Sequence, residues 1–355
     1  MDKYELVAEM LRKFPGWGNV SSDDLRMFFR GELGGENVFD EGIRLGNCRR
    51  IAIRPKYALL VCAGTFPHPS WQAMARLALV ETERLYIKLP DSSCSDMIAD
   101  AARWMGAKRI FSDVEISHGL PVGGLGEFDV VLVYGSSETV SFFRDLVPWN
   151  KKFLGFGNKV SLVVVNGRDV HLESAHLIVR DVLAFSQQGC LAPHVCYVCD
   201  GDANLMGSFC ARAFKEAYAS GIKIPQWDVV AASRIFTTRR AETAVGSEIF
   251  IPEDGSLAWT VVVSLTEDFE ISPTHQVLRI KRCNPAEKLT ELLKPWRDSL
   301  STIALSPNQP PPAGTGASRF CALGCMQQPS LFWSQDGYCP LAELVTWVSY
   351  EDNLS

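Results

Sequence analysis

Residues 128–138 read FDVVLVYGSSE, and this stretch decides the fold. The run from Phe128 to Tyr134 has the length and the Val-rich composition of a strand that is buried on both faces. Gly135-Ser136 then marks a turn, and residues Glu138–Leu146 show helical spacing. A strand, a glycine turn and a helix in this order indicate an α/β unit with a parallel sheet.

The same alternation continues on both sides of this stretch. Further apolar runs predict strands at Ala58–Ala63, Leu85–Lys88, Arg109–Phe111 and Val160–Val165. Segments with helical spacing predict helices at Trp71–Val80, Ser95–Met105 and Leu172–Phe185. The pattern predicts a doubly wound, Rossmann-type α/β sheet, with ligands at the carboxyl ends of its strands.

A second α/β unit is predicted after residue 186. Its strands are expected at Val195–Val198, Asp228–Ala231, Leu257–Leu265 and Gln276–Ile280, and its helices at Asn204–Ala219 and Ala286–Leu300, the latter bent at Pro295. With 355 residues the chain is long enough for two cores. We therefore expect an N-terminal arm or cap (1–49), a first domain (50–186), a second domain (187–328) and a C-terminal segment (329–355) that packs back or oligomerises.

The composition is that of an ordinary globular protein. Hydrophobic residues make up 47% and charged residues 21%, and a net charge of −6 argues against nucleic acid as a partner. The first residues lack the apolar core of a signal peptide, and no run approaches the roughly 20 apolar residues of a membrane helix. We expect a cytoplasmic protein whose eleven cysteines stay reduced and serve packing, metal binding or catalysis.

Cys190 lies in the sequence Gln187-Gln188-Gly189-Cys190, between a predicted helix and a predicted strand. A cysteine in such a turn can face a substrate, and amide groups of the turn can face a bound oxygen. Cysteine is also among the commonest residues of protein cores. The residues by themselves therefore leave catalysis and packing both open.

Together with four other segments, Gln188-Gly189-Cys190 makes residues 50 to 350 resemble the aldehyde dehydrogenase superfamily. Specifically, they resemble its acyl-CoA reductase branch, the fatty-acid reductases of bacterial luminescence. The other segments, in the order of the family, are residues 62–67 with 86–91 (CAGTFP and YIKLPD), 133–138 (VYGSSE), 154–159 (LGFGNK) and 316–329 (GASRFCALGCMQQP).

The resemblance implies a nicotinamide cofactor, NADPH or NADH, bound to the 50–186 domain. It implies that Lys88 lies against the adenosine ribose, that Asp91 binds a ribose hydroxyl, and that Gly135 and Ser136 lie near the pyrophosphate. Residues 248–252 (EIFIP) are similar to a family segment whose acid holds the nicotinamide ribose, which implies that role for Glu248. Alternatively, Lys88 ends a strand, Ser136 is an ordinary helix cap and Glu248 is a solvated acid.

For the 187–328 domain the resemblance implies catalysis, with Cys190 as the nucleophile. Thr65 stands where many relatives have an asparagine that binds the oxyanion, and its hydroxyl can also donate a hydrogen bond. Gly155 stands where hydrolytic relatives have the glutamate that activates water. The resemblance therefore implies reduction of an acyl thioester, most simply a fatty acyl-CoA, to an aldehyde through an acyl-Cys190 intermediate.

Two alternatives remain from the sequence. The chain could be an aldehyde dehydrogenase-like scaffold or regulatory subunit with impaired catalysis, which Thr65 and a short N-terminal part would favour. It could also be an aldehyde dehydrogenase that runs in the oxidative direction. For an active reductase, the resemblance implies acyl-CoA or an acyl carrier as substrate, an acyl-activating partner protein and a homo-oligomer.

Other polar residues are interpreted as structural. Cys196 and Cys199, with Cys321 and Cys325, have spacings that a zinc site could use, but residues three apart on a strand point to opposite faces. No metal is therefore expected. His176 and His194 could donate protons near Cys190, and Arg319 could bind a phosphate or simply fasten the C-terminal segment.

Overall fold

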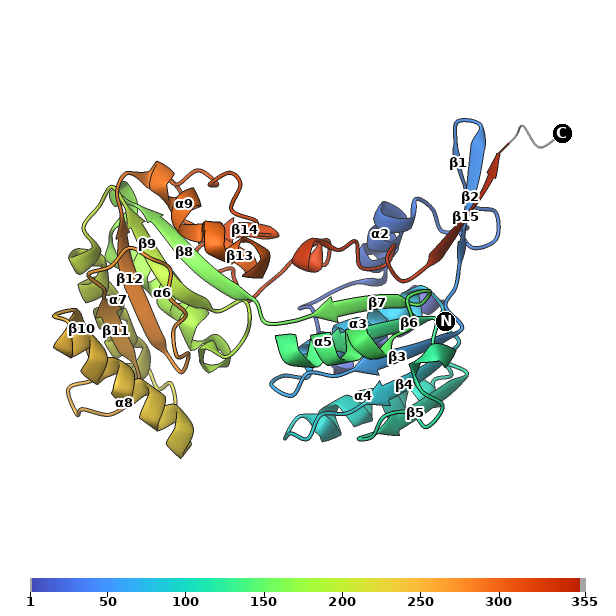
Figure 1. Cartoon of the computed structure of the whole chain (residues 1–355), viewed down its shortest axis with the longest axis horizontal. Coiled ribbons are helices and arrows are strands. Elements are labelled where there is room, and N and C mark those ends of the chain that lie inside the picture. The colour runs from blue at the N-terminus through green and yellow to red at the C-terminus, as the bar shows by residue number, and fades with distance from the viewer. Residues whose placement is uncertain (1, 352–355) are drawn as a thin grey trace. The chain divides into compact units, whose positions relative to one another are not determined.

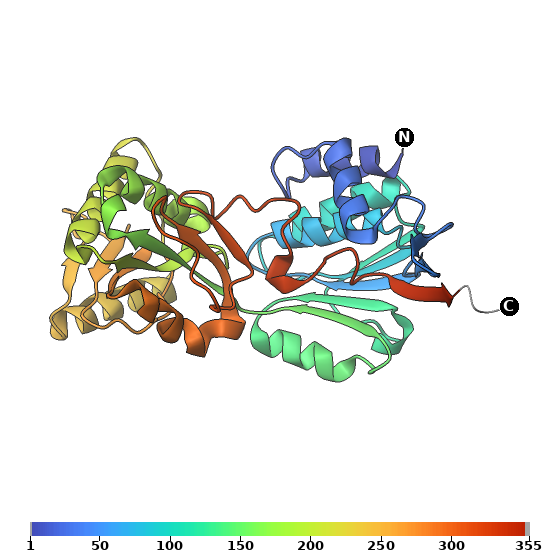
Figure 2. The same cartoon turned by 90° about the horizontal axis from the view of Figure 1, so that it is seen from above.

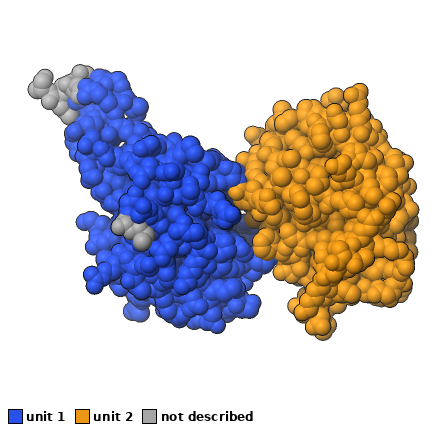
Figure 3. Space-filling view, turned by 180° about the vertical axis from the view of Figure 1, so that it is seen from behind, with its two compact units in different colours: residues 1–158, 330–355 blue, residues 159–329 orange. Residues whose placement is uncertain are grey.

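The computed structural model describes residues 2–351, and these fall into two compact units. Unit 1 comprises residues 1–158 and 330–355, and unit 2 comprises residues 159–329 (Figure 3). The sequence boundary was expected between 186 and 187. The structure divides the chain earlier because the strand and helix over residues 160–183 belong to the second sheet and its core.

Nine α-helices and fifteen strands are found in the described residues 2–351 (Figure 1). The helices are α1 (Lys3–Lys13), α2 (Ser22–Leu33), α3 (His68–Leu79), α4 (Ser95–Ala107), α5 (Ser137–Leu146), α6 (Leu172–Leu183), α7 (Ala203–Ala219), α8 (Val229–Ala244) and α9 (Leu289–Leu293). The strands are β1 (Ile43–Leu45), β2 (Cys48–Ile53), β3 (Tyr57–Val61), β4 (Arg84–Lys88), β5 (Asp113–Ser117), β6 (Val130–Tyr134), β7 (Lys152–Phe156), β8 (Val160–Asn166), β9 (Pro193–Cys199), β10 (Glu248–Phe250), β11 (Thr260–Val263), β12 (Val277–Cys283), β13 (Leu300–Leu305), β14 (Arg319–Ala322) and β15 (Thr346–Glu351).

The sheet of unit 1 is parallel and has the strand order β5-β4-β3-β6-β7. α5 covers one face, and α3 and α4 cover the other (Figure 2). β3 and β6 are buried along their whole length, because helices on both faces leave no solvated side. The predicted doubly wound sheet is confirmed, and its order reverses direction between β3 and β6.

The N-terminal residues are not a loose arm. They form two helices, α1 and α2, and α2 begins at a capping box formed by Ser21 and Asp24. Phe28 and Phe29 of α2 are buried in the same core as α3 and α4. The expected limit at residue 49 falls inside β2, so this segment is an outer layer of unit 1 rather than a separate cap.

Unit 2 contains a seven-stranded sheet with the order β10-β11-β12-β9-β8-β13-β14. All neighbouring strands are parallel except β10, which is antiparallel to β11. α6 and α7 pack on one face, and α8 and α9 pack on the other (Figure 2). The expected α/β class is thus confirmed for this unit too.

Three predicted elements are wrong. Residues Asp228–Ala231 are the start of α8, because Asp228 caps the helix by accepting a hydrogen bond from the Ala231 amide. Residues Arg109–Phe111 form a turn in which Arg109 has a positive φ, and the strand follows at β5. The helix expected over Ala286–Leu300 is reduced to α9 with short 3₁₀ turns, and Leu300 already begins β13.

The C-terminal segment packs against unit 1. Leu341, Leu344 and Val345 enter the core that contains α1 to α4, and β15 pairs with β2 in a three-stranded antiparallel sheet, β1-β2-β15. Within residues 2–351, no helix combines the length and the apolar character needed to cross a bilayer.

Candidate active site

Most of the predicted cofactor residues lie at one edge of the unit 1 sheet. Lys88 is the last residue of β4, the turn with Thr65 follows β3, and Gly135-Ser136 follows β6. Because β4, β3 and β6 are adjacent and parallel, these positions meet at their common carboxyl end. The strand order also reverses between β3 and β6, which is where a dinucleotide binds in such sheets.

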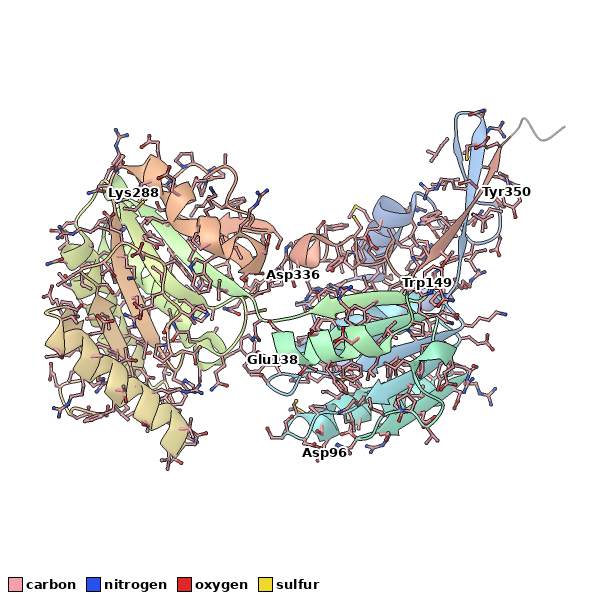
Figure 4. The ribbon with its side chains drawn as sticks, in the orientation of Figure 1. Asp96, Glu138, Trp149, Lys288, Asp336 and Tyr350 are labelled. Atoms are coloured by element: carbon pink, nitrogen blue, oxygen red, sulfur yellow. The ribbon has the colours of Figure 1, made fainter. Side chains whose placement is uncertain are left out.

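The turn at Gly135-Ser136 joins β6 to α5 and is closely packed against the first turn of that helix. Ser136 caps α5, and its hydroxyl accepts a hydrogen bond from the Thr139 amide at 3.3 Å. A Cβ on Gly135 would meet two carbon atoms of Thr139 at 3.0 Å, so the position is tight for any larger residue. Glu138 also lies at this amino end of α5 (Figure 4). The turn therefore offers helix amides to a ligand, which fits the phosphates of a dinucleotide.

Lys88 and Asp91 have polar side-chain atoms that a ligand at the same edge of the sheet could contact. The Lys88 ammonium is 3.4 Å from the Leu89 carbonyl, which is too long for a strong hydrogen bond. Asp91 is exposed, and one of its carboxylate oxygens is 3.1 Å from Nδ1 of His118. Thr65 is exposed. Lys88, Asp91, Gly135 and Ser136 could thus hold the ribose and phosphates of a dinucleotide, whereas Thr65 lies in a different unit from Cys190.

Cys190 lies in unit 2, exposed on a tight turn at the amino end of β9. The turn is closed by a hydrogen bond of 2.9 Å from the Ala192 amide to the Gly189 carbonyl. Before it, Phe185, Ser186 and Gln187 have φ values of 50°, 53° and 62°, all in the left-handed region. Backbone strain of this kind persists only where surrounding contacts enforce it, and it concentrates at functional sites.

Gln187 supplies those contacts. Its side chain is fully buried, and Nε2 donates to the carbonyls of Pro193 at 2.8 Å and Val277 at 2.9 Å. Oε1 accepts a hydrogen bond from the Val277 amide at 2.9 Å. One side chain therefore fastens the turn to β9 and β12. Gln187 could not be predicted as a functional residue, because nothing in the sequence separates it from its exposed neighbour Gln188.

Glu248 is not brought to Cys190, although both lie in unit 2. It is the first residue of β10, at the edge of the sheet and three strands from β9, which is about 14 Å sideways. Its partner Val263 ends β11, so Glu248 lies toward the carboxyl end of the parallel strands and Cys190 at their amino end. There Glu248 lines a polar hollow with Arg282 and Lys288. This separation does not support the predicted nicotinamide role.

Close packing around position 155 leaves room only for glycine. Gly155 lies in β7 under α5, and a Cβ there would be 2.5 Å from Cγ1 of Val140 and 2.8 Å from the Phe153 ring. Real Cβ atoms do not approach other atoms so closely. The position therefore has no room for the carboxylate that hydrolytic relatives carry.

The two histidines show no catalytic arrangement. Burial lowers the pKa of His194 to about 4, so its ring is neutral near pH 7 and a poor proton donor. His176 is on α6, with Nε2 2.6 Å from a Glu216 carboxylate oxygen. Arg319 donates to the backbone carbonyls of Cys325 and Met326, both at 2.7 Å, which fastens the segment after β14.

The cysteine pairs are also structural in appearance. Cys196 and Cys199 lie on opposite faces of β9 and pack into two different cores. Across residues 2–351, no group of three or more His, Cys, Asp or Glu side chains could hold a metal ion. The cysteines exposed to solvent in that range are Cys190 and Cys339.

Solved structures resemble the whole chain at low sequence identity. A glyceraldehyde-3-phosphate dehydrogenase, GapN, from Methanocaldococcus jannaschii, complexed with NADP, matches with a TM-score of 0.63 and 13% identity, over 98% of this chain and 85% of that one. An NAD-dependent benzaldehyde dehydrogenase from Corynebacterium glutamicum matches with a TM-score of 0.62 and 14% identity, over 99% and 81%. These similarities show the aldehyde dehydrogenase fold.

Relatives with similar sequences identify the family within this fold. A long-chain acyl-protein thioester reductase of Photobacterium phosphoreum is 21% identical over 341 residues, covering 90% of this chain and 68% of the relative. One of Aliivibrio fischeri is 24% identical over 342 residues, covering 90% and 69%. The family model described as Acyl-CoA reductase (LuxC) matches residues 124–347, more than half of the chain. This confirms the resemblance in the sequence: the chain belongs to the acyl-CoA reductase (LuxC) family.

Proposed function

We propose that this protein reduces an acyl thioester to an aldehyde, with Cys190 as the residue that carries the acyl group. The observation that carries the proposal is an exposed cysteine on a strained turn that a buried glutamine fastens to two strands. Membership of the acyl-CoA reductase family supports the class of reaction. A nucleophile held in this way is the arrangement that covalent acyl transfer needs.

The chemistry begins at the sulfur of Cys190. Its thiolate attacks the thioester carbonyl, the carbon–sulfur bond of the substrate breaks, and the carrier thiol leaves as the acyl group passes to Cys190. Amides of the turn stabilise the oxyanion that forms. After reduction of the acyl carbon, the bond to Cys190 breaks, the aldehyde leaves and the thiolate returns.

The reductant in this proposal is a nicotinamide dinucleotide, NADPH or NADH, which when bound supplies a hydride to the acyl carbon. Gly135 and Ser136 bind its phosphates through the amino end of α5, and Lys88 and Asp91 bind its adenosine ribose. The crowding that a Cβ would cause at Gly135 and the available atoms of Lys88 support this assignment. Glu248 is left out of the site because of its position in the sheet.

Position 155 supports reduction over hydrolysis. The resemblance assigns the water-activating glutamate of hydrolytic relatives to this position, and the contacts of Gly155 with Val140 and Phe153 leave no space for it. An acyl-Cys190 without that base should react slowly with water. It therefore persists long enough to be reduced.

We further propose a long-chain acyl group as substrate, delivered on CoA or on a carrier protein by an acyl-activating partner. The names of the Photobacterium and Aliivibrio relatives, long-chain acyl-protein thioester reductases, support a protein-bound donor. Assays with the same acyl chain on CoA, on free pantetheine and on a carrier protein separate these donors. A donor preference would appear in kcat/KM.

The deciding experiment mixes purified protein with acyl thioesters of several chain lengths and follows absorbance of NADPH or NADH. Thioester-dependent consumption with release of aldehyde is expected, and Cys190→Ala should lose nearly all of it. Cys339→Ala is the matched control, because Cys339 is also exposed but lies in unit 1. Unchanged turnover in Cys190→Ala would exclude the covalent route, and no turnover in the wild type would favour a non-catalytic scaffold.

A further inference from the structure

Ser161, a buried serine of β8, forms a hydrogen bond with the backbone of Cys190. The Ser161 hydroxyl donates a hydrogen bond to the Cys190 carbonyl at 2.7 Å and accepts one from the Thr302 amide at 3.2 Å. Its side chain has no exposed surface. Ser161 therefore links the proposed nucleophile to β13, and its hydroxyl acts as both a hydrogen-bond donor and an acceptor.

The strands on both sides of Ser161 are irregular at this level. Against β13, Leu300 pairs with Val160 and Ile303 with Leu162, so two residues of β13 lie opposite Ser161 alone. Against β9, the register also shifts between Ser161 and Leu162. Because the register shifts at this level, the Thr302 amide donates its hydrogen bond to the Ser161 hydroxyl. Bulges that direct a group in this way are common beside active sites.

The hydrogen bond fixes the peptide plane between Cys190 and Leu191. In a trans peptide the carbonyl and the following N–H point in opposite directions. Since the carbonyl points to the buried Ser161, the Leu191 N–H points away from the interior. Within residues 2–351 this N–H donates no hydrogen bond, so it can serve a ligand on the exposed side.

From these contacts we infer that Ser161 is a positioning residue for Cys190, an inference that rests on the proposed function. Its hydroxyl keeps an N–H donor, and not a carbonyl acceptor, beside the sulfur on the solvent side. Without it the peptide is free to rotate, and a carbonyl dipole would then oppose negative charge on the thiolate and on the oxyanion.

The first test does not require turnover. Alkylation of Cys190 by iodoacetamide is followed as a function of pH by mass spectrometry of the peptide. Ser161→Ala should move the midpoint of the alkylation profile to higher pH and slow alkylation severalfold near pH 7, because the thiolate loses a favourable dipole. Ser161→Thr, which keeps the hydroxyl, should restore the wild-type profile.

Ser318→Ala is the matched control. The Ser318 hydroxyl also donates to a backbone carbonyl of β13, that of Ser301 at 3.2 Å, but from the β14 side of the strand, opposite to Ser161 in β8. Its alkylation profile should be that of the wild type. If Ser161→Ala does not fold, Ser161→Cys replaces it, and this weaker donor of similar size should give an intermediate midpoint.

The second test uses the proposed reaction. Ser161→Ala should lower kcat about tenfold or more and leave the KM for the nicotinamide cofactor unchanged, because the cofactor residues are in unit 1. A folded Ser161→Ala protein with the wild-type alkylation profile and kcat would overturn the inference, as would an equal effect of Ser318→Ala. If the wild type reduces no thioester, the proposed function fails, and the alkylation profile still decides the role of Ser161.

Discussion

The side chain of Gln187 pairs with both backbone groups of Val277. Nε2 donates to the Val277 carbonyl and Oε1 accepts from the Val277 amide, each at 2.9 Å. The side-chain amide thus pairs with the first residue of β12, before the pairing of β12 with β9 begins at Arg279. The proposed nucleophile lies three residues after Gln187, so the position of Cys190 depends on this pairing.

Gln187→Glu should therefore destabilise the protein. A carboxylate can accept from the Val277 amide but cannot donate to the Pro193 and Val277 carbonyls, and it would be buried against both. We expect a loss of about 2–4 kcal/mol near pH 7, measured by urea or thermal unfolding. Gln188→Glu, at an exposed position, should change stability by less than about 0.5 kcal/mol. Equal stability of the two variants would contradict the anchoring role.

Asp91 should influence the choice of cofactor. Its exposed carboxylate follows the second strand of a β-α-β unit, where an acid binds the 2′-hydroxyl of NADH and repels the 2′-phosphate of NADPH. Asp91→Asn should raise the ratio of kcat/KM for NADPH to that for NADH about tenfold, equivalent to about 1.4 kcal/mol. Asp96→Asn removes the same charge from the first turn of α4 and should leave the ratio unchanged. A ratio that also stays constant in Asp91→Asn would place the ribose elsewhere.

Gly155→Ala should be destabilising although alanine is the smallest change. The new Cβ would approach Val140 to 2.5 Å, and relief of this overlap costs about 1–3 kcal/mol. Gly31→Ala in α2 meets no atom within 4 Å and should instead stabilise by about 0.5–1 kcal/mol. In the double variant Gly155→Ala with Val140→Ala, part of the loss at position 155 should be recovered. Chemical unfolding of the four proteins decides between these outcomes.

Asp181 makes stability depend on pH. Burial raises its pKa to about 6, above its usual value of 3.8. Because the folded state then binds the proton more tightly than the unfolded state, the contribution is most favourable below pH 4 and is lost as pH rises through 6. Asp181→Asn should remove a cost of about 3 kcal/mol at pH 8 and have little effect near pH 4.

The measurement for Asp181 is the midpoint of thermal unfolding across pH 4 to 8 for both proteins. The asparagine can still accept the hydrogen bond that Asp181 Oδ1 receives from the Met326 amide. A difference between the two midpoints that does not grow with pH would show that the carboxyl group is not protonated in the folded protein near pH 5.

The sequence by itself determined the class of the fold, and it predicted which edge of the sheet binds the cofactor and which cysteine is the nucleophile. Continuous apolar runs such as Phe128–Tyr134 predict buried parallel strands, and a glycine turn after such a strand predicts the ligand edge, because these features depend only on neighbouring residues. Cys190 was predicted as the nucleophile from its segment together with the resemblance of four other segments to the family. Local signals failed at Asp228–Ala231, where the two valines suggested a strand and the cap at Asp228 starts α8.

Only the tertiary structure decided which residues far away in the sequence contact the proposed site and which lie elsewhere. Ser161 and Gln187 are ordinary polar residues until β13, β9 and β12 come together around the turn of Cys190. The segment around Glu248 suggested that this residue binds the nicotinamide ribose. The position of Glu248 depends, however, on the order of β10, β11 and β12 in the sheet, which no local pattern encodes. Hydrogen bonds between strands join residues far apart in the chain, and their partners are therefore fixed by topology rather than by spacing.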